Sequence, residues 1–151
     1  MPSKQRLLLV LAATALAGTT ATVHAATRAT VLKARLTGAY LHTTSKGSGS
    51  ATITFEGSKV CWKFAFSGLD TGEDSGIHLA QPPAPGKHKT SVFPFTASTS
   101  EKPGCVATNH WGPSSASWAA KIAATPGKFY VIIATAKYPQ GAIGGMLHGA
   151  A

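Results

Sequence analysis

The amino-acid sequence predicts an all-β fold. We expect an antiparallel β-sandwich or barrel of about seven or eight short strands, immunoglobulin-like or superoxide-dismutase-like, with one short helix. Two observations lead to this prediction. Apolar and polar residues alternate from about Thr30 onwards, which is the two-residue period of a half-buried strand. Segments rich in glycine, proline and serine separate the alternating stretches at short intervals.

The alternation is clearest over residues 51–68, which predict two strands joined at Glu56-Gly57-Ser58. One face of the second strand is aromatic and the other carries Lys63, so the hairpin should bury one side and expose the other to water. Cys61 falls on the Lys63 side. The apolar positions are Ala51, Ile53 and Phe55 in the first strand and Val60, Trp62, Phe64 and Phe66 in the second.

Three more strands follow from the same pattern. Residues 30–38 predict a first strand with Lys33 and Arg35 facing outward. Its inward positions are Leu32, Ala34 and Leu36. Residues 128–136 are apolar on both faces, which is typical of a central strand. Residues 142–149 predict a last short strand, in which the glycines indicate a bulge or a close approach of two backbone segments.

One segment departs from the two-residue period. Over residues 114–127, Trp118 and Ile122 are four positions apart, a serine can cap the start, and Pro126-Gly127 ends the pattern. These features predict one short helix.

The N-terminus predicts an exported protein. Residues 1–25 have a basic start, an apolar run of about a dozen residues and small residues at the cleavage-critical positions of Val23-His24-Ala25, which is the pattern of a signal peptide. A membrane-spanning helix would need about 20 apolar residues, and the polar residues at 18–20 interrupt the run before that. We therefore expect a single mature domain over residues 26–151, without a later transmembrane segment, secreted to the extracellular space and either free or associated with the cell wall.

The mature chain is basic. Residues 26–151 hold 12 lysines and arginines against 5 acidic residues, a formal charge of +7. Such a charge attracts polyanions, and the local concentrations Lys33/Arg35 and Lys87/Lys89 are candidate anion-binding residues. The alternative is a basic exterior that serves only solubility. No aromatic stacking platform for single-stranded nucleic acid is evident, so we expect no specific nucleic-acid partner.

Two cysteines, Cys61 and Cys105, lie in the exported part, where an oxidising environment would let them pair. Closing a loop of that length would stabilise the fold by about 4 kcal/mol in the loop-entropy model. A catalytic thiol or a soft-metal ligand is the alternative, although neither cysteine belongs to a Cys-x-x-Cys pair. A bridge at Cys61 would clip a loop or a neighbouring sheet across the outer face.

The segment "SGIHLAQPPAPGKH", residues 75–88, raises the question of whether it is a metal site or only a loop. His78 and His88 are candidate ligands, but no two histidines stand at the spacing of two that would let them share an ion from one strand. The preceding run of Asp70, Glu73 and Asp74 is either a solvated turn or a weak calcium site. We assign no catalytic residue and no cofactor, the metal is unknown, and the stretches 82–85 and 98–104 are predicted loops.

Five segments in order give a family resemblance: "LTGAYLHTT", "KVCWKFAFSGL", "GIHLAQPPAPG", "GCV" and "PGKFYVIIATAKYPQGAIGGML". Over essentially the whole mature chain the sequence resembles a chordin-type (CHRD) domain of the secreted bacterial type. The cysteine pair also stands where such members commonly carry theirs. The resemblance implies an exported β-rich domain but supplies no reaction.

Two positions depart from that family's pattern. Gly76 stands where many members have the first histidine of a His-Ile-His motif, and Gly144 stands where the family usually has arginine. We therefore expect a secreted, non-catalytic interaction module that binds an unknown extracellular protein or an anionic surface polymer. The alternative is a metal-binding or metal-dependent redox protein that uses His78.

Overall fold

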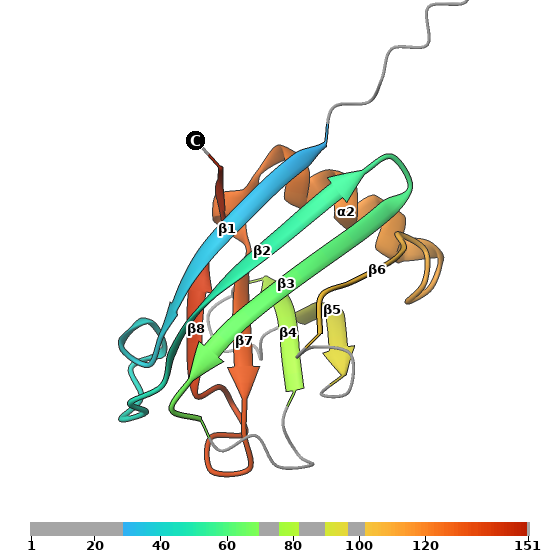
Figure 1. Ribbon diagram of the computed structural model, residues 1–151. Coiled ribbons are helices and arrows are strands. Elements are labelled where there is room, and N and C mark those ends of the chain that lie inside the picture. The colour runs from blue at the N-terminus through green and yellow to red at the C-terminus, as the bar shows by residue number, and fades with distance from the viewer. Residues whose placement is uncertain (1–28, 70–75, 82–89, 97–101, 151) are drawn as a thin grey trace, which may run out of the picture.

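The computed structural model describes residues 29–69, 76–81, 90–96 and 102–150. In this part of the chain, eight strands form one antiparallel sheet in the order β5-β4-β7-β8-β1-β2-β3-β6, and a ninth, two-residue strand pairs with β1 (Figure 1). The predicted all-β class with one short helix is therefore confirmed. The strands are β1 (Thr30–Thr37), β2 (Ser48–Glu56), β3 (Lys59–Ser67), β4 (Gly76–Gln81), β5 (Thr90–Thr96), β6 (Gly104–Ala107), β7 (Tyr130–Ala134), β8 (Ile143–Met146) and β9 (His148–Gly149).

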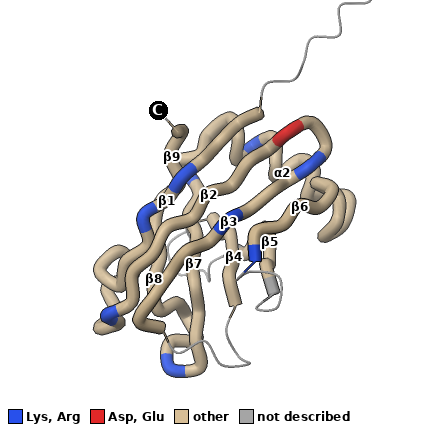
Figure 2. Tube along the Cα trace, viewed as in Figure 1, with Lys and Arg blue, Asp and Glu red and all other residues tan. Residues whose placement is uncertain are grey.

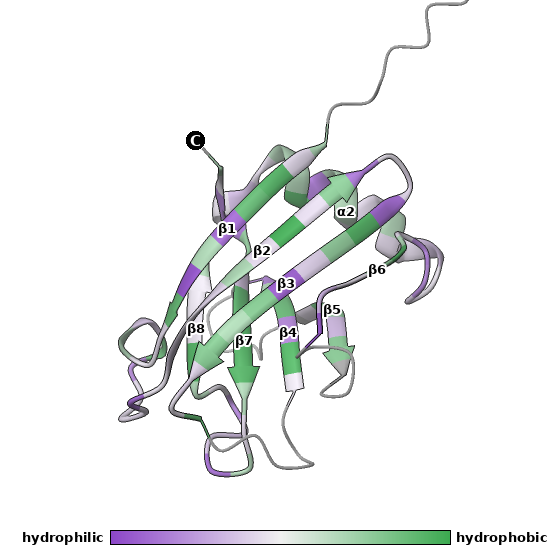
Figure 3. Ribbon diagram, in the orientation of Figure 1, coloured by the Kyte–Doolittle hydropathy of each residue, from purple (hydrophilic) through white to green (hydrophobic). Residues whose placement is uncertain are grey.

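The sheet curls into a half-barrel, with β1, β2 and β3 crossing in front of β4, β7 and β8 (Figure 1). The alternation along β1 and β3 is visible in the hydropathy colouring of Figure 3. Leu32, Ala34 and Leu36 are buried as predicted, and Lys33 and Arg35 are exposed. The inward side chains of both halves therefore share one hydrophobic core.

Aromatic rings join the two ends of the curled sheet. Trp62 and Phe64 of β3 lie with ring centroids 5.2 Å and 5.3 Å from that of Phe95 in β5. Trp111 packs against Phe95 at 5.4 Å and against Phe93 at 5.0 Å. Since β3 and β5 lie near opposite ends of the strand order, these contacts require the sheet to bend back on itself.

The helix α2 (Pro113–Ala124) closes one end of the half-barrel, with Ile122 fully buried and Trp118 in edge contact with Phe129. The prediction that a serine caps its start is wrong, because the N-cap is Gly112. Pro113 takes the first helical position, which its fixed backbone angle favours, and so the helix begins before the serines. The short 3-10 helix η2 (Pro126–Lys128) follows directly, so the predicted end of the helix is correct.

Strand β7 is central, as predicted, and lies between β4 and β8. Its outward-facing Tyr130 and Ile132 are covered by Tyr40 and Leu41 of the 3-10 helix η1 (Ala39–Leu41). Burial raises the pKa of Tyr130, and the neighbouring Tyr40 raises it further, with the two ring centroids 5.9 Å apart. Because the pKa of Tyr130 is higher in the folded protein than in the unfolded chain, the fold is most stable while the phenol is neutral. This contribution to the free energy of unfolding is fully present below the ordinary tyrosine pKa and is lost as the pH rises through the folded-state pKa.

The glycines of β8 allow the close approach that the sequence predicts. A Cβ atom at Gly145 would overlap the carbonyl group of Arg35 in β1, and one at Gly144 would lie 2.9 Å from the carbonyl oxygen of Val131 and 3.0 Å from the Leu41 side chain. Only glycine therefore lets β8 sit between β1 and β7.

One predicted loop is partly wrong, because Gly104 of the predicted 98–104 loop begins β6. Residues 76–81, part of the segment for which the sequence left open a metal site or a loop, form β4. Both strands are short and border proline or glycine, which hides their alternation. Residues 82–85 lie outside the described residues.

Substituting Gly145 with alanine should destabilise the protein by at least about 2 kcal/mol, because backbone atoms of β1 occupy the space that the Cβ needs. Urea unfolding of G145A measures the change. Gly149→Ala is the matched control, since nothing lies within 4 Å of a Cβ there. Equal stability of the two variants would contradict the close approach of β8 to β1.

Candidate anion-binding face

The outward side chains of β1, β2 and β3 form a polar, cationic surface. Lys33 lies opposite Thr52, which lies opposite Lys63, and Arg35 lies opposite Ser50. Residues opposite one another in antiparallel strands point to the same side of the sheet. We name this surface the cationic face and define it as Lys33, Arg35, Ser48, Ser50, Thr52, Lys63 and Ser67.

Strand spacing sets the separation of the charges on the cationic face. Lys33 and Lys63 are two strands apart, or about 10 Å, and Lys33 and Arg35 are two residues apart along β1, or about 7 Å. All three side chains are exposed. The exposed His148 of β9 lies opposite Lys33 and extends the row by one strand. Anionic groups that repeat about every 7 to 10 Å would fit this array.

A shallow hollow of about 500 Å³ lies on the cationic face beside Arg35. The hollow forms because the residues next to Arg35 in the neighbouring strands, Ser50 and Ala65, have small side chains. The full lining is Arg35, Ser48, Gly49, Ser50, Ala65, Phe66 and Ser67. The guanidinium group therefore stands beside hydroxyl groups that can donate or accept hydrogen bonds.

Charges of one sign dominate this surface. Within the described residues, Glu56 is the one acidic side chain, and it lies at the tip of the β2–β3 hairpin opposite Lys59 (Figure 2). The Lys33 and Arg35 prediction thus places both residues correctly on the outside, but the contribution of Lys63 becomes visible only with the register of the sheet. Lys87 and Lys89 lie outside the described residues.

The predicted disulfide is present and joins Cys61 of β3 to Cys105 of β6. The two residues are opposite one another in the register, with Cα atoms 4.0 Å apart. Cys105 is exposed, so the bridge lies on the outer side, as predicted. It connects two neighbouring strands of one sheet.

His78 lies within β4, opposite Ile132 of β7 and Pro94 of β5. Its Nδ1 atom is 3.0 Å from the Ser91 hydroxyl oxygen, so the ring is hydrogen-bonded across to the neighbouring strand. A Cβ at Gly76 would lie 3.0 Å from the His78 Nε2 atom, so the imidazole lies over the glycine.

Metal ligands do not gather in the described part of the chain: it contains no group of three or more His, Cys, Asp or Glu side chains able to hold an ion. His88 and the acidic run at Asp70, Glu73 and Asp74 lie outside the described residues.

A curled antiparallel half-barrel with an external disulfide defines a β-rich domain of the kind that is compatible with the extracellular space. A family model of the CHRD domain matches residues 32–147, and the chain therefore belongs to the CHRD domain family. Membership indicates a module of the extracellular type. No curated protein and no solved structure matches the chain.

Among the described residues, no helix has the length and hydropathy to cross a bilayer. The Leu41 side chain occupies the space beside Gly144, the position where the family usually has arginine. A longer side chain at residue 144 would have to displace it.

Replacing both cysteines with alanine should lower the free energy of unfolding by about 4 kcal/mol in the loop-entropy model, since the bridge spans a sequence separation of 44 residues. Urea unfolding of the C61A/C105A variant measures this loss. A reductant should leave the free energy of unfolding of the variant unchanged, whereas it should lower that of the native protein. A native protein that keeps its stability in reductant, with both thiols shown to be free, would contradict the expectation.

Proposed function

We propose that the chain is a secreted, non-catalytic module that binds an anionic polymer at the extracellular surface through the cationic face. The observation that carries the proposal is the register that sets Lys33, Arg35 and Lys63 side by side among hydroxyl groups. A linear polyanion can contact several cations at once and release its counterions, which favours binding at low salt.

The polarity of the surface also favours a polymer over a folded protein partner. Protein interfaces usually have an apolar centre with aromatic anchors. The described side chains of the cationic face are ammonium, guanidinium and hydroxyl groups. These groups bind anions and include no carboxylate, which supports a binding role over an acid-base reaction.

The secretion part of the proposal rests on residues 1–25. Export from a bacterial host should yield a mature protein that starts at Ala26, because the signal peptidase recognises the small residues before that bond. Intact-mass measurement and N-terminal sequencing of the protein in the culture medium test this outcome. Retention of Met1 in exported protein would contradict it.

Binding to alginate, a polyuronate, should weaken at least about tenfold at low salt when Lys33 and Lys63 are both changed to glutamine. The affinity of the native protein should fall steeply with salt, and the variant should show a shallower dependence. Isothermal titration or surface-immobilised alginate measures both quantities, with neutral dextran as the reference polymer.

Lys121→Gln/Lys128→Gln is the matched control for the alginate experiment. It removes the same charge from exposed lysines on α2 and η2, away from the cationic face. If both double variants lose affinity equally, the effect is one of net charge and the cationic face is not the binding site. If neither native protein nor variant binds alginate more tightly than dextran, the proposed function is wrong for polyuronates.

A further inference from the structure

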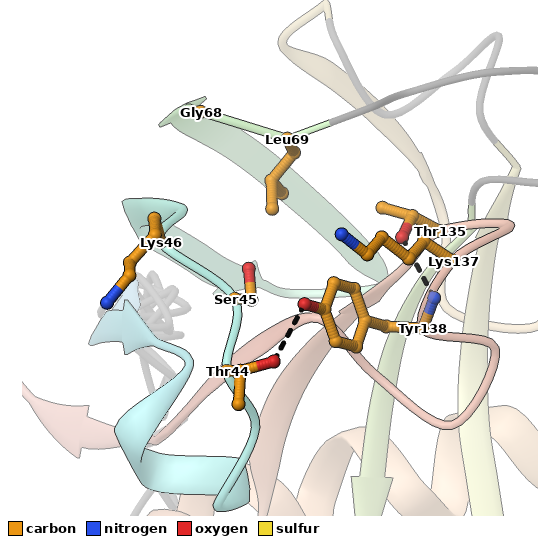
Figure 4. Close-up of a pocket in the computed structure, with 8 residues that line it drawn as sticks. All are labelled: Thr44, Ser45, Lys46, Gly68, Leu69, Thr135, Lys137 and Tyr138. Carbon is orange, nitrogen blue, oxygen red and sulfur yellow. Dashed lines mark hydrogen bonds between the residues drawn. The ribbon is translucent and has the colours of Figure 1, made fainter.

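A separate pocket of about 250 Å³ lies at one end of the half-barrel (Figure 4). Three chain segments form it: residues 44–46 before β2, residues 68–69 after β3, and residues 135–138 after β7. The lining residues are Thr44, Ser45, Lys46, Gly68, Leu69, Thr135, Lys137 and Tyr138, and we name this site the end pocket. It is smaller than the 300 to 1,000 Å³ typical of sites for drug-sized ligands, roughly the size for one small ring.

Backbone contacts fix the walls of the end pocket. Thr135 and Tyr138 exchange backbone hydrogen bonds of 3.2 Å and 3.0 Å, so the turn between them is closed. The Thr43 hydroxyl donates to the Ala142 carbonyl oxygen at 2.8 Å, which holds the neighbouring segment in place. A Cβ at Gly47 would overlap the Leu69 side chain, so the segment can approach Leu69 only with glycine there.

Hydroxyl groups supply most of the polar atoms of the end pocket. The Thr44 and Tyr138 hydroxyl oxygens are 3.1 Å apart, and one donates to the other. The Thr135 hydroxyl accepts from the Tyr138 backbone N–H at 3.2 Å, and Ser45 accepts from the Gly47 N–H at 3.2 Å. Thr135 is only 1% exposed, so its hydroxyl group holds the turn, whereas the exposed Thr44 hydroxyl group is accessible to a hydroxylated ligand.

One lysine reaches across the end pocket. Figure 4 shows the Lys137 side chain extended toward Leu69, whereas the Lys46 side chain, on the opposite side, points away from the other lining residues. The Lys137 ammonium nitrogen lies 5.6 Å from the centre of the Tyr138 ring. None of the described residues that line the end pocket is acidic. The Lys137 ammonium group can therefore pair with a ligand that carries one carboxylate.

The remaining walls are apolar, since Leu69 and the ring of Tyr138 offer carbon surfaces beside the hydroxyl groups. The combination matches a sugar ring, which has C–H faces, hydroxyl edges and, in a uronate, one carboxylate. We propose that the end pocket binds a single uronate unit, with Lys137 paired to the carboxylate and the Thr44 hydroxyl group hydrogen-bonded to a ring hydroxyl.

The position of the end pocket connects this inference to the proposed function, on which it rests for the identity of the polymer. Lys46 precedes Ser48 by two residues, and Ser67 precedes Gly68 directly, so the end pocket adjoins the hollow of the cationic face. A polyuronate that lies along the cationic face can therefore place one of its units in the end pocket. The face would supply affinity through charge, and the pocket would supply selectivity for the sugar.

Titration of the full mature protein with sodium glucuronate, followed by amide NMR shifts, tests the end pocket. Saturable shifts should appear around residues 44–46, 68–69 and 135–138, with a dissociation constant below roughly 10 mM. Glucose and acetate should each bind at least about tenfold more weakly, because glucose lacks the carboxylate and acetate lacks the sugar ring. Lys137→Gln should weaken glucuronate binding by a similar factor, whereas Lys128→Gln should not.

Each failure points to a different part of the proposal. Absent saturation by glucuronate, equal affinity for glucose, or an unaffected Lys137→Gln variant would overturn the inference about the end pocket. Tyr138→Phe, which keeps the ring and removes the hydroxyl, provides a second variant should Lys137→Gln fail to fold. The Lys33→Gln/Lys63→Gln variant should bind glucuronate normally. If this variant binds glucuronate normally but also binds alginate as tightly as the native protein does, the cationic face is not the polymer-binding site. The proposed function then fails, and the inference about the end pocket stands.

Discussion

Packing between aromatic rings of β3 and β5 holds the curled sheet closed, and the other surfaces depend on that curl. Trp62 and Phe95 meet across the core, and Trp111 packs against both. An uncurled sheet would expose the inward face of these strands to water, so burial of the rings favours the bent form. With Trp62 fixed inward, the strand period of two directs Cys61 and Lys63 outward. The core therefore determines where the charges and the disulfide lie.

Regular alternation made much of the fold predictable. Strands β1, β2 and β3 show a clear period of two, and β7 is apolar on both faces (Figure 3), so their burial could be inferred from the sequence. Strands β4 and β6 were not predicted as strands, because each is short and borders glycine or proline. The position of the helix was predicted correctly, but its N-cap residue was not. Several neighbouring residues could act as the N-cap, and the preference of Pro113 for the first helical position makes Gly112 the N-cap.

The cationic face and the end pocket were harder to predict from the sequence. Lys33 and Arg35 share a strand, so their common outward direction follows from their spacing. The placement of Lys63 beside them depends on which strands pair, and alternation alone does not specify that. The end pocket is harder still, because it joins Thr44, Leu69 and Tyr138 from three segments far apart in the chain. The hydrogen bond between His78 and Ser91 likewise depends on the pairing of β4 with β5, which alternation does not specify.

The disulfide has a further consequence for the edge of the sheet. Strand β6 is a four-residue edge strand, and such strands separate easily from a sheet and pair with other chains. Separation would also remove Gly104 from the side of Trp62, which has a close contact with it. The covalent link to β3 keeps the edge in place. Proteases cleave segments that have separated from a fold, so the bridge opposes cleavage within β6 itself.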